Sequence, residues 1–153
     1  MSRFSEFVFD EETDKPWKLT QKAKKRLLKL RDLLLKDAKN KKGLQFDMGT
    51  WGEVGVGEKP GLTCNTRACA LGLAALSGEF KRAGLGYELS ANGQIWPTLN
   101  GVQGADTVLV GAEAFDIPHR LSNALFGAWY EDGDGAEAER NMAKIIKYLV
   151  KHG

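Results

Sequence analysis

Apolar residues recur at helical spacing in two long segments of the chain. In the first, Ala23, Leu27, Leu30, Leu34 and Ala38 follow one another at intervals of four, three, four and four residues. This period predicts an amphipathic helix, and a threonine just before it, at position 20, is suited to be its N-cap. A second stripe near the C-terminus predicts another amphipathic helix. Its apolar members are Ala138, Met142, Ile145, Ile146 and Leu149.

Between these helices lies a short segment, Ala68–Leu76, that is apolar at almost every position. A helix that is hydrophobic on all sides must be surrounded by other elements, so residues 66–77 are expected to form a buried central helix. Asn65 and Thr66 are suited to cap it. Cys64 and Arg67 would then lie with them at the helix N-terminus, where free amides and the helix dipole favour an anion.

Short strands are expected on either side of this segment. Residues 43–61 are rich in glycine, and their alternating apolar positions predict either an open loop or a hairpin of 46–50 against 53–57. Asn92-Gly93 between apolar segments predicts a second hairpin, of 87–90 against 94–96. Residues 105–115 fit a strand or a helix, and we favour a helix. Pro118 is typical of the first turn of another helix.

These elements predict an α+β fold that is mostly helical, with about five helices packed around a buried central helix and one or two small β-hairpins. With 153 residues, of which 42% are hydrophobic and 27% charged, the chain has the size and composition of one globular domain. We assign that domain to residues 18–153. Residues 1–17 form an acidic and aromatic N-terminal arm.

The N-terminus lacks the layout of a signal peptide, and no apolar run is long enough to cross a membrane. The chain has two cysteines only, which are too close in sequence to link distant parts of a secreted domain. We therefore expect a cytoplasmic protein without a membrane partner.

The segment Cys64-Asn65-Thr66-Arg67-Ala68-Cys69-Ala70-Leu71-Gly72 resembles a pattern found in uncharacterised small bacterial and phage proteins. Their motif is Cys-Gly-Thr, two free positions, Cys, and Gly three residues later, and an Asp and a Trp precede it, as Asp47 and Trp51 do here. The resemblance covers roughly residues 44–127. This chain departs from the motif in having Asn65 where glycine is usual. The resemblance implies a bacterial or phage source and no particular activity.

A thiol enzyme is one interpretation of the cysteine motif. A cysteine at a helix N-terminus can have a lowered pKa, which favours the nucleophilic thiolate. Such an enzyme also needs a base, and His119 with the neighbouring Asp116 is the credible partner for Cys64. A zinc site built from Cys64, Cys69 and His119 lacks a fourth ligand, so no metal site is predicted. The sequence shows no phosphate-binding loop and no dinucleotide-binding motif, and no cofactor is predicted.

The first predicted helix offers a second interpretation. Four lysines, at positions Lys22, Lys25, Lys29 and Lys36, share the face opposite its apolar stripe. Such a face is able to follow the phosphates of a nucleic acid, but it is more often an ordinary solvated surface, and the aromatic residues expected of a single-strand binder are absent from it.

No complete set of catalytic residues can be identified, which favours a non-catalytic binding protein over an enzyme. The resemblance suggests a phage-encoded protein that engages a host protein or a small anionic ligand. The predicted ligand-binding residues surround the expected helix N-terminus: Trp51, Cys64, Asn65, Thr66 and Arg67.

Overall fold

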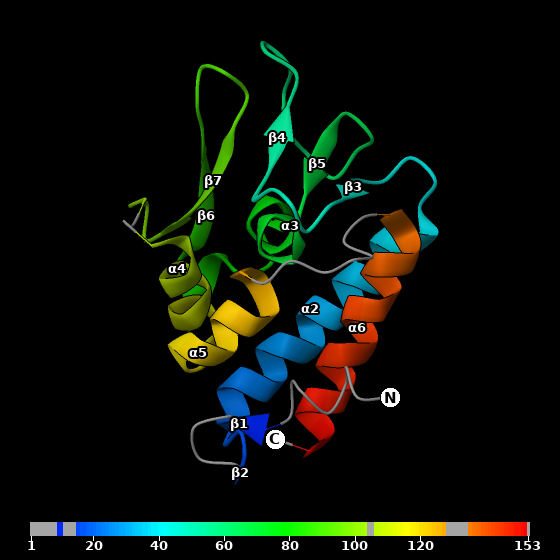
Figure 1. Ribbon diagram of the computed structural model, residues 1–153. Helices are drawn as coiled ribbons and strands as arrows, with labels where there is room; N and C mark the ends of the chain where they lie inside the picture. The colour runs from blue at the N-terminus through cyan, green and yellow to red at the C-terminus, as the bar shows by residue number, and fades with distance from the viewer. Residues whose placement is uncertain (1–8, 11–14, 104–105, 128–134, 153) are drawn as a thin grey trace.

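Helix α2, Gln21–Lys39, is the longest element of the computed structural model, which describes residues 9–10, 15–103, 106–127 and 135–152 (Figure 1). The predicted N-cap is confirmed, because the Thr20 hydroxyl accepts a hydrogen bond of 3.0 Å from the Ala23 amide. The predicted apolar stripe is buried, with Ala23, Leu27, Leu30 and Leu34 all inaccessible to solvent.

Helix α6, Gly135–His152, lies along α2 and buries the second predicted stripe (Figure 1). The two helices pack side by side and form one side of the molecule. Of the N-terminal arm, strand β1 (Phe9–Asp10) pairs antiparallel with β2 (Lys15–Pro16). Trp17, which follows β2, belongs to the hydrophobic core.

Helix α3, Ala70–Ser77, begins four residues later than predicted. Thr66–Ala68, expected in its first turn, instead form strand β5, and Cys69 is the N-cap. The strand forms because it has a partner on each side, so its backbone groups are paired in a sheet rather than free at a helix end. Residues 70–75 are all buried, and α3 contacts α2 and strands β5, β6 and β7.

Strand β5 is the middle strand of a three-stranded sheet with the order β3-β5-β4. Strand β3 (Gln45–Phe46) pairs with it in parallel and β4 (Glu53–Val54) pairs with it antiparallel. The alternative of a hairpin of 46–50 against 53–57 is therefore wrong. Strand β5, from later in the chain, occupies the position between the two segments.

Strands β6 (Leu85–Leu89) and β7 (Ile95–Leu99) pair antiparallel on either side of the Asn92-Gly93 turn. Gly93 has a φ of +86°, which glycine adopts without strain. The β7 end of this pair adjoins β4, because the Ile95 amide donates to the Gly52 carbonyl (2.7 Å) and the Val54 amide to the Gly93 carbonyl (2.9 Å). The β4 and β7 segments therefore form one surface.

Two further helices complete the fold below the β6–β7 pair (Figure 1). The sequence of residues 105–115 fitted either a strand or a helix, and the structure has a helix there, α4 (Thr107–Phe115). Helix α5 (His119–Ser122) follows Pro118 and continues into a π-helical turn, Asn123–Gly127. A 3-10 turn, Lys81–Ala83, connects α3 to β6. The rings of Phe80, Phe115 and Phe126 pack in series, with centroids 5.0 and 5.5 Å apart.

The predicted fold class, α+β and rich in helix, is thus confirmed. Among the described residues there are five α-helices and three small sheets. No helix in that part of the chain combines the length and hydrophobicity needed to cross a bilayer.

Candidate functional site

The N-terminus of α3 is closed, which corrects the predicted position of the ligand site. Cys69, the N-cap, is 1% exposed, and its amide donates to the Thr50 carbonyl at 3.0 Å. The Trp51 carbonyl lies beside α3 as well, close to the Cys69 sulfur. Cys64, Asn65, Thr66 and Arg67 precede this N-terminus by a strand. They do not form an anion site on the dipole of α3.

Asn65 and Thr66 hold the loop that leads into β5. Thr66 is fully buried, and its hydroxyl donates to Asn65 Oδ1 (2.9 Å) and accepts from the Gly61 amide (3.1 Å). Asn65 Nδ2 donates to the Lys59 carbonyl at 3.1 Å. These bonds tie residues 59–66 together, so Thr66 has a structural role and only the exposed Asn65 is accessible to a ligand.

Arg67 lies between two carboxylates. Its guanidinium is 3.4 Å from Glu53 Oε1 and 3.8 Å from Asp47 Oδ2, and its side chain is half exposed. The two carboxylates together outweigh its single positive charge. A free anion is consequently a poor match for this position, in contrast to the prediction.

The structure does not bring the predicted thiol–histidine pair together. Cys64 is exposed in the turn before β5, whereas His119 begins α5 in a different part of the molecule (Figure 1). His119 Nε2 contacts Asp106 Oδ2 at 2.7 Å, and this hydrogen bond lowers the pKa of Asp106. Asp116 accepts a hydrogen bond from the Thr20 hydroxyl instead of orienting the imidazole.

The second cysteine, Cys69, differs from Cys64 in its exposure to solvent. Cys69 is buried, and burial raises the pKa of its thiol to about 11. A thiol with a raised pKa is a poor nucleophile near neutral pH, so Cys69 acts as a core residue.

The four lysines of the predicted basic face are exposed on α2, at positions Lys22, Lys25, Lys29 and Lys36. Lys29 also packs locally, since its Nζ donates to the Glu79 carbonyl at 3.0 Å and lies 5.6 Å from the Phe80 ring centroid. Nucleic-acid binding through this face stays a prediction. Charge reversal at Lys22 and Lys25 tests it by retention on nucleic acid at low salt.

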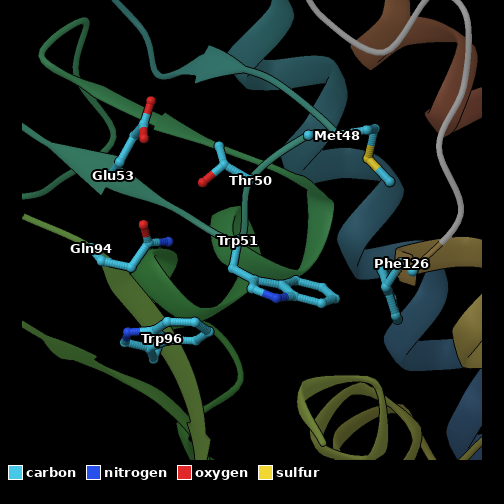
Figure 2. A pocket seen from close by; sticks show the side chains of 9 residues that line it. Met48, Thr50, Trp51, Glu53, Gln94, Trp96 and Phe126 are labelled. Carbon is cyan, nitrogen blue, oxygen red and sulfur yellow. The ribbon is translucent and has the colours of Figure 1, made fainter.

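Trp51 lines a cavity of about 390 Å³ next to the β4–β7 junction, which we call the aromatic cavity (Figure 2). It comes from the loop before β4, and Trp96 comes from β7. The large apolar side chains of the lining are Met48, Trp51, Trp96 and Phe126. Thr50, Glu53 and Gln94 add polar groups at the same cavity.

A second cavity of about 330 Å³, the amide cavity, lies beside it over β4 and β5. Four carboxamide side chains dominate its polar lining: Gln45, Asn65, Asn92 and Gln94. Glu53 and Arg67 add one negative and one positive charge. Gln94 Nε2 donates to the Gly52 carbonyl, and Gln45 Nε2 to the Cys64 carbonyl. Within the described part of the chain, the Oε1 atoms of both glutamines accept no hydrogen bond and remain available to a ligand.

Glu53 and Gln94 line both cavities, so the two lie next to each other, and we call the pair of cavities the trough. Of the predicted ligand-binding residues, the trough contains Trp51, Asn65 and Arg67. It does not contain Cys64 or Thr66. Sequence reasoning missed Glu53, Gln94 and Trp96 as site residues. The strong Asn92-Gly93 turn signal placed Gln94 and Trp96 on a strand, but nothing local showed that this strand adjoins β4.

Comparison of the chain with protein-family models, with curated proteins and with solved structures gives no match.

Proposed function

We propose that this protein is a non-catalytic binding protein that holds a small ligand in the trough. The observation that carries the proposal is the sharing of Glu53 and Gln94 by an aromatic cavity and an amide cavity. Sites for small molecules are commonly concave and apolar, with a few polar groups that fix orientation. The trough has both parts, and its two volumes are in the range of such sites.

The lining indicates the kind of ligand. Trp51 and Trp96 offer indole surface to a flat apolar group, which gains from burial and from the ring geometry. At the other end, the free Oε1 atoms of Gln45 and Gln94 accept hydrogen bonds from N–H or O–H groups. Because the charges of Glu53 and Asp47 together outweigh that of Arg67, the trough disfavours an anion, and an uncharged ligand fits better than an anion. The proposed ligand is a neutral molecule with a ring at one end and hydrogen-bond donors at the other.

The test is a ligand-observed NMR screen of neutral ring-bearing primary amides, each paired with the carboxylate of the same skeleton. Indole-3-acetamide and indole-3-acetate are the reference pair. We expect amides to bind and their matched carboxylates to bind at least several-fold more weakly. Trp96→Ala should reduce the affinity of the amides about tenfold or more, because it removes one aromatic surface.

Tyr148→Ala is the matched control, since Tyr148 is an exposed aromatic residue on α6 and does not line the trough. Its affinities should equal those of the wild type. Binding by no member of the set, or equal losses in Trp96→Ala and Tyr148→Ala, would contradict the proposal. A uniform preference for carboxylates would restore the anionic ligand that the sequence suggested.

A further inference from the structure

Strand β6 is an open edge of the β6–β7 pair, which stands at one side of the molecule (Figure 1). The outer edge of β7 is occupied, because its Ile95 amide donates to the Gly52 carbonyl and its Leu99 amide to the Val102 carbonyl. No described strand pairs with β6 on the side away from β7. The last three residues of β6, 87–89, are all exposed. The strand therefore offers its backbone to another chain.

Hydrogen bonds at the two ends of β6 show which of its backbone groups face β7. Below the strand, the Asn100 amide donates to the Gly84 carbonyl at 2.7 Å. Above it, the Ser90 amide donates to the Gln94 carbonyl at 2.8 Å. In an antiparallel pair such bonded positions alternate, so the even-numbered residues of β6 bond to β7 and the odd-numbered residues point their backbone groups outward.

Two odd-numbered residues have outward backbone groups that remain unpaired. Tyr87 lies opposite Pro97, which has no amide hydrogen, as expected for a position that does not bond across the pair. The Leu85 amide donates to the Phe80 carbonyl at 3.2 Å. For the backbone groups of Tyr87 and Leu89, in contrast, the described part of the chain provides no partner.

The sequence of β6 does not protect this edge. Edge strands commonly carry a lysine, a proline or a bulge that prevents pairing with another chain. Strand β6 reads Leu-Gly-Tyr-Glu-Leu, and its register with β7 is continuous. Tyr87 is 39% exposed and Leu89 is 44% exposed, and alternate positions place both side chains on one face of the strand. Free backbone groups beside exposed apolar side chains indicate a surface for an added strand.

We propose that β6 pairs antiparallel with β6 of a second copy of this chain, with Tyr87 of each copy at the two-fold axis. The pairing joins two β6–β7 pairs into one four-stranded sheet. Tyr87 exchanges two hydrogen bonds with its counterpart, and each Leu89 amide donates to the carbonyl of the partner's Leu85. The exposed Tyr87 and Leu89 side chains then pack against tyrosine and leucine across the interface.

Charge selects this register and a second copy as the partner. With Tyr87 at the axis, Glu88 lies opposite the partner's Gly86, which has no side chain to repel it. With Glu88 at the axis, two carboxylates would lie directly opposite each other, which is destabilising. Lys81 and Arg82 precede the strand, so an antiparallel pair brings the basic end of one copy beside the acidic end of the other. The strand is thus complementary to itself, as a two-fold interface requires.

The interface is small, because each copy contributes one short strand and two apolar side chains. Interfaces of this size belong to weak complexes, so we expect a reversible dimer that dissociates on dilution. The pairing is independent of the proposed function, since no residue of β6 lines the trough.

Sedimentation velocity over about a hundredfold range of protein concentration tests the proposal. We expect a monomer–dimer equilibrium in the wild type and dimerisation at least tenfold weaker in Tyr87→Pro. Proline there removes a hydrogen bond of the dimer and none of the β6–β7 pair, because that amide points outward. Leu89→Lys, which adds a charge to the same edge, should act alike. Val56→Lys is the matched control, since Val56 is 75% exposed and lies outside β6, and it should dimerise as the wild type does.

Cysteine cross-linking tests the register. In a Cys64→Ala background, which removes the exposed thiol, Tyr87→Cys places two thiols opposite each other with Cα atoms about 5.5 Å apart, within the range of a disulfide. Under mild oxidation, Tyr87→Cys should form a covalent dimer and Glu88→Cys should not. A monomer at every concentration, dimerisation that Tyr87→Pro and Leu89→Lys leave unchanged, or preferential cross-linking of Glu88→Cys would overturn the proposal.

Discussion

A Cβ atom on Gly72 of α3 would lie 1.8 Å from the carbonyl oxygen of Trp51. The backbone of the loop before β4 thus rests directly on the buried helix, at a distance that only glycine permits. Trp51 is one of the two indoles that line the aromatic cavity. Gly72 therefore sets the position of a trough residue through its contact with that residue's backbone.

Gly72→Ala should destabilise the protein by about 2–3 kcal/mol, because the new methyl group forces the loop away from α3. The free energy of unfolding by urea measures this effect. Gly61→Ala is the control, since a Cβ at Gly61 meets nothing within 4 Å and should change stability by no more than about 0.5 kcal/mol. Equal unfolding midpoints for Gly72→Ala and the wild type would show that the loop does not rest on α3.

The two cysteines should differ strongly in reactivity. A disulfide reagent such as DTNB should modify one thiol per folded chain at pH 8, because Cys64 is exposed and Cys69 is buried with a pKa near 11. Unfolding in guanidinium should expose the second thiol. Cys64→Ala should abolish the fast reaction, and rapid modification of two thiols in the folded protein would contradict the buried position of Cys69.

Glu139 of α6, which is buried next to Asp37 of α2 as an acid pair, predicts an unusual dependence of stability on pH. Its pKa is about 10 in the folded chain, against an ordinary value of 4.5, so the folded state binds more protons than the unfolded state between these values. The contribution of Glu139 is therefore fully present below pH 4.5 and declines as the pH rises toward 10. The pKa of Asp37 is also raised by burial, which acts in the same direction.

Urea unfolding at pH 6, 7.5 and 9 measures the decline, which for one proton is at most about 1.4 kcal/mol per pH unit. Glu139→Gln carries no proton to lose, so its stability should vary less with pH and exceed that of the wild type at pH 9. Glu137→Gln, at an exposed position of the same helix, should follow the wild type. A wild-type stability that rises from pH 6 to pH 9 would be evidence against the buried acid pair.

The sequence predicted the elements whose signals are local. Helix α2 has a regular apolar period and a threonine at its N-cap, and both are found in the structure. Strand β5 was missed for a physical reason, since Thr66–Ala68 pair with β3, 22 residues earlier in the chain, and with β4, 12 to 14 residues earlier, and neither pairing has a local signal. Because this strand was missed, the helix that follows it was predicted to begin at residue 66, whereas α3 begins at Ala70.

The candidate site depends on the same kind of non-local contact. Trp51 and Trp96 are separated by the whole of β5, α3 and β6, and no pattern in the sequence pairs them. The buried acid pair did leave a signal. Asp37 follows Leu30 and Leu34 at helical spacing, and Glu139 precedes Met142 and Ile146 in the same way. A carboxylate on the buried stripe of each of two helices predicts such a pair.

The most direct test of the account is the location of a bound ring by NMR. Indole-3-acetamide, or the tightest amide of the screen, is added to ¹⁵N-labelled protein while the indole N–H signals of Trp51 and Trp96 and the side-chain amide of Gln94 are followed. We predict that these three signals shift together and saturate at one concentration. Shifts confined to the exposed face of α2 or to the turn at Cys64, with the Trp51 and Trp96 signals unmoved, would contradict the proposed site.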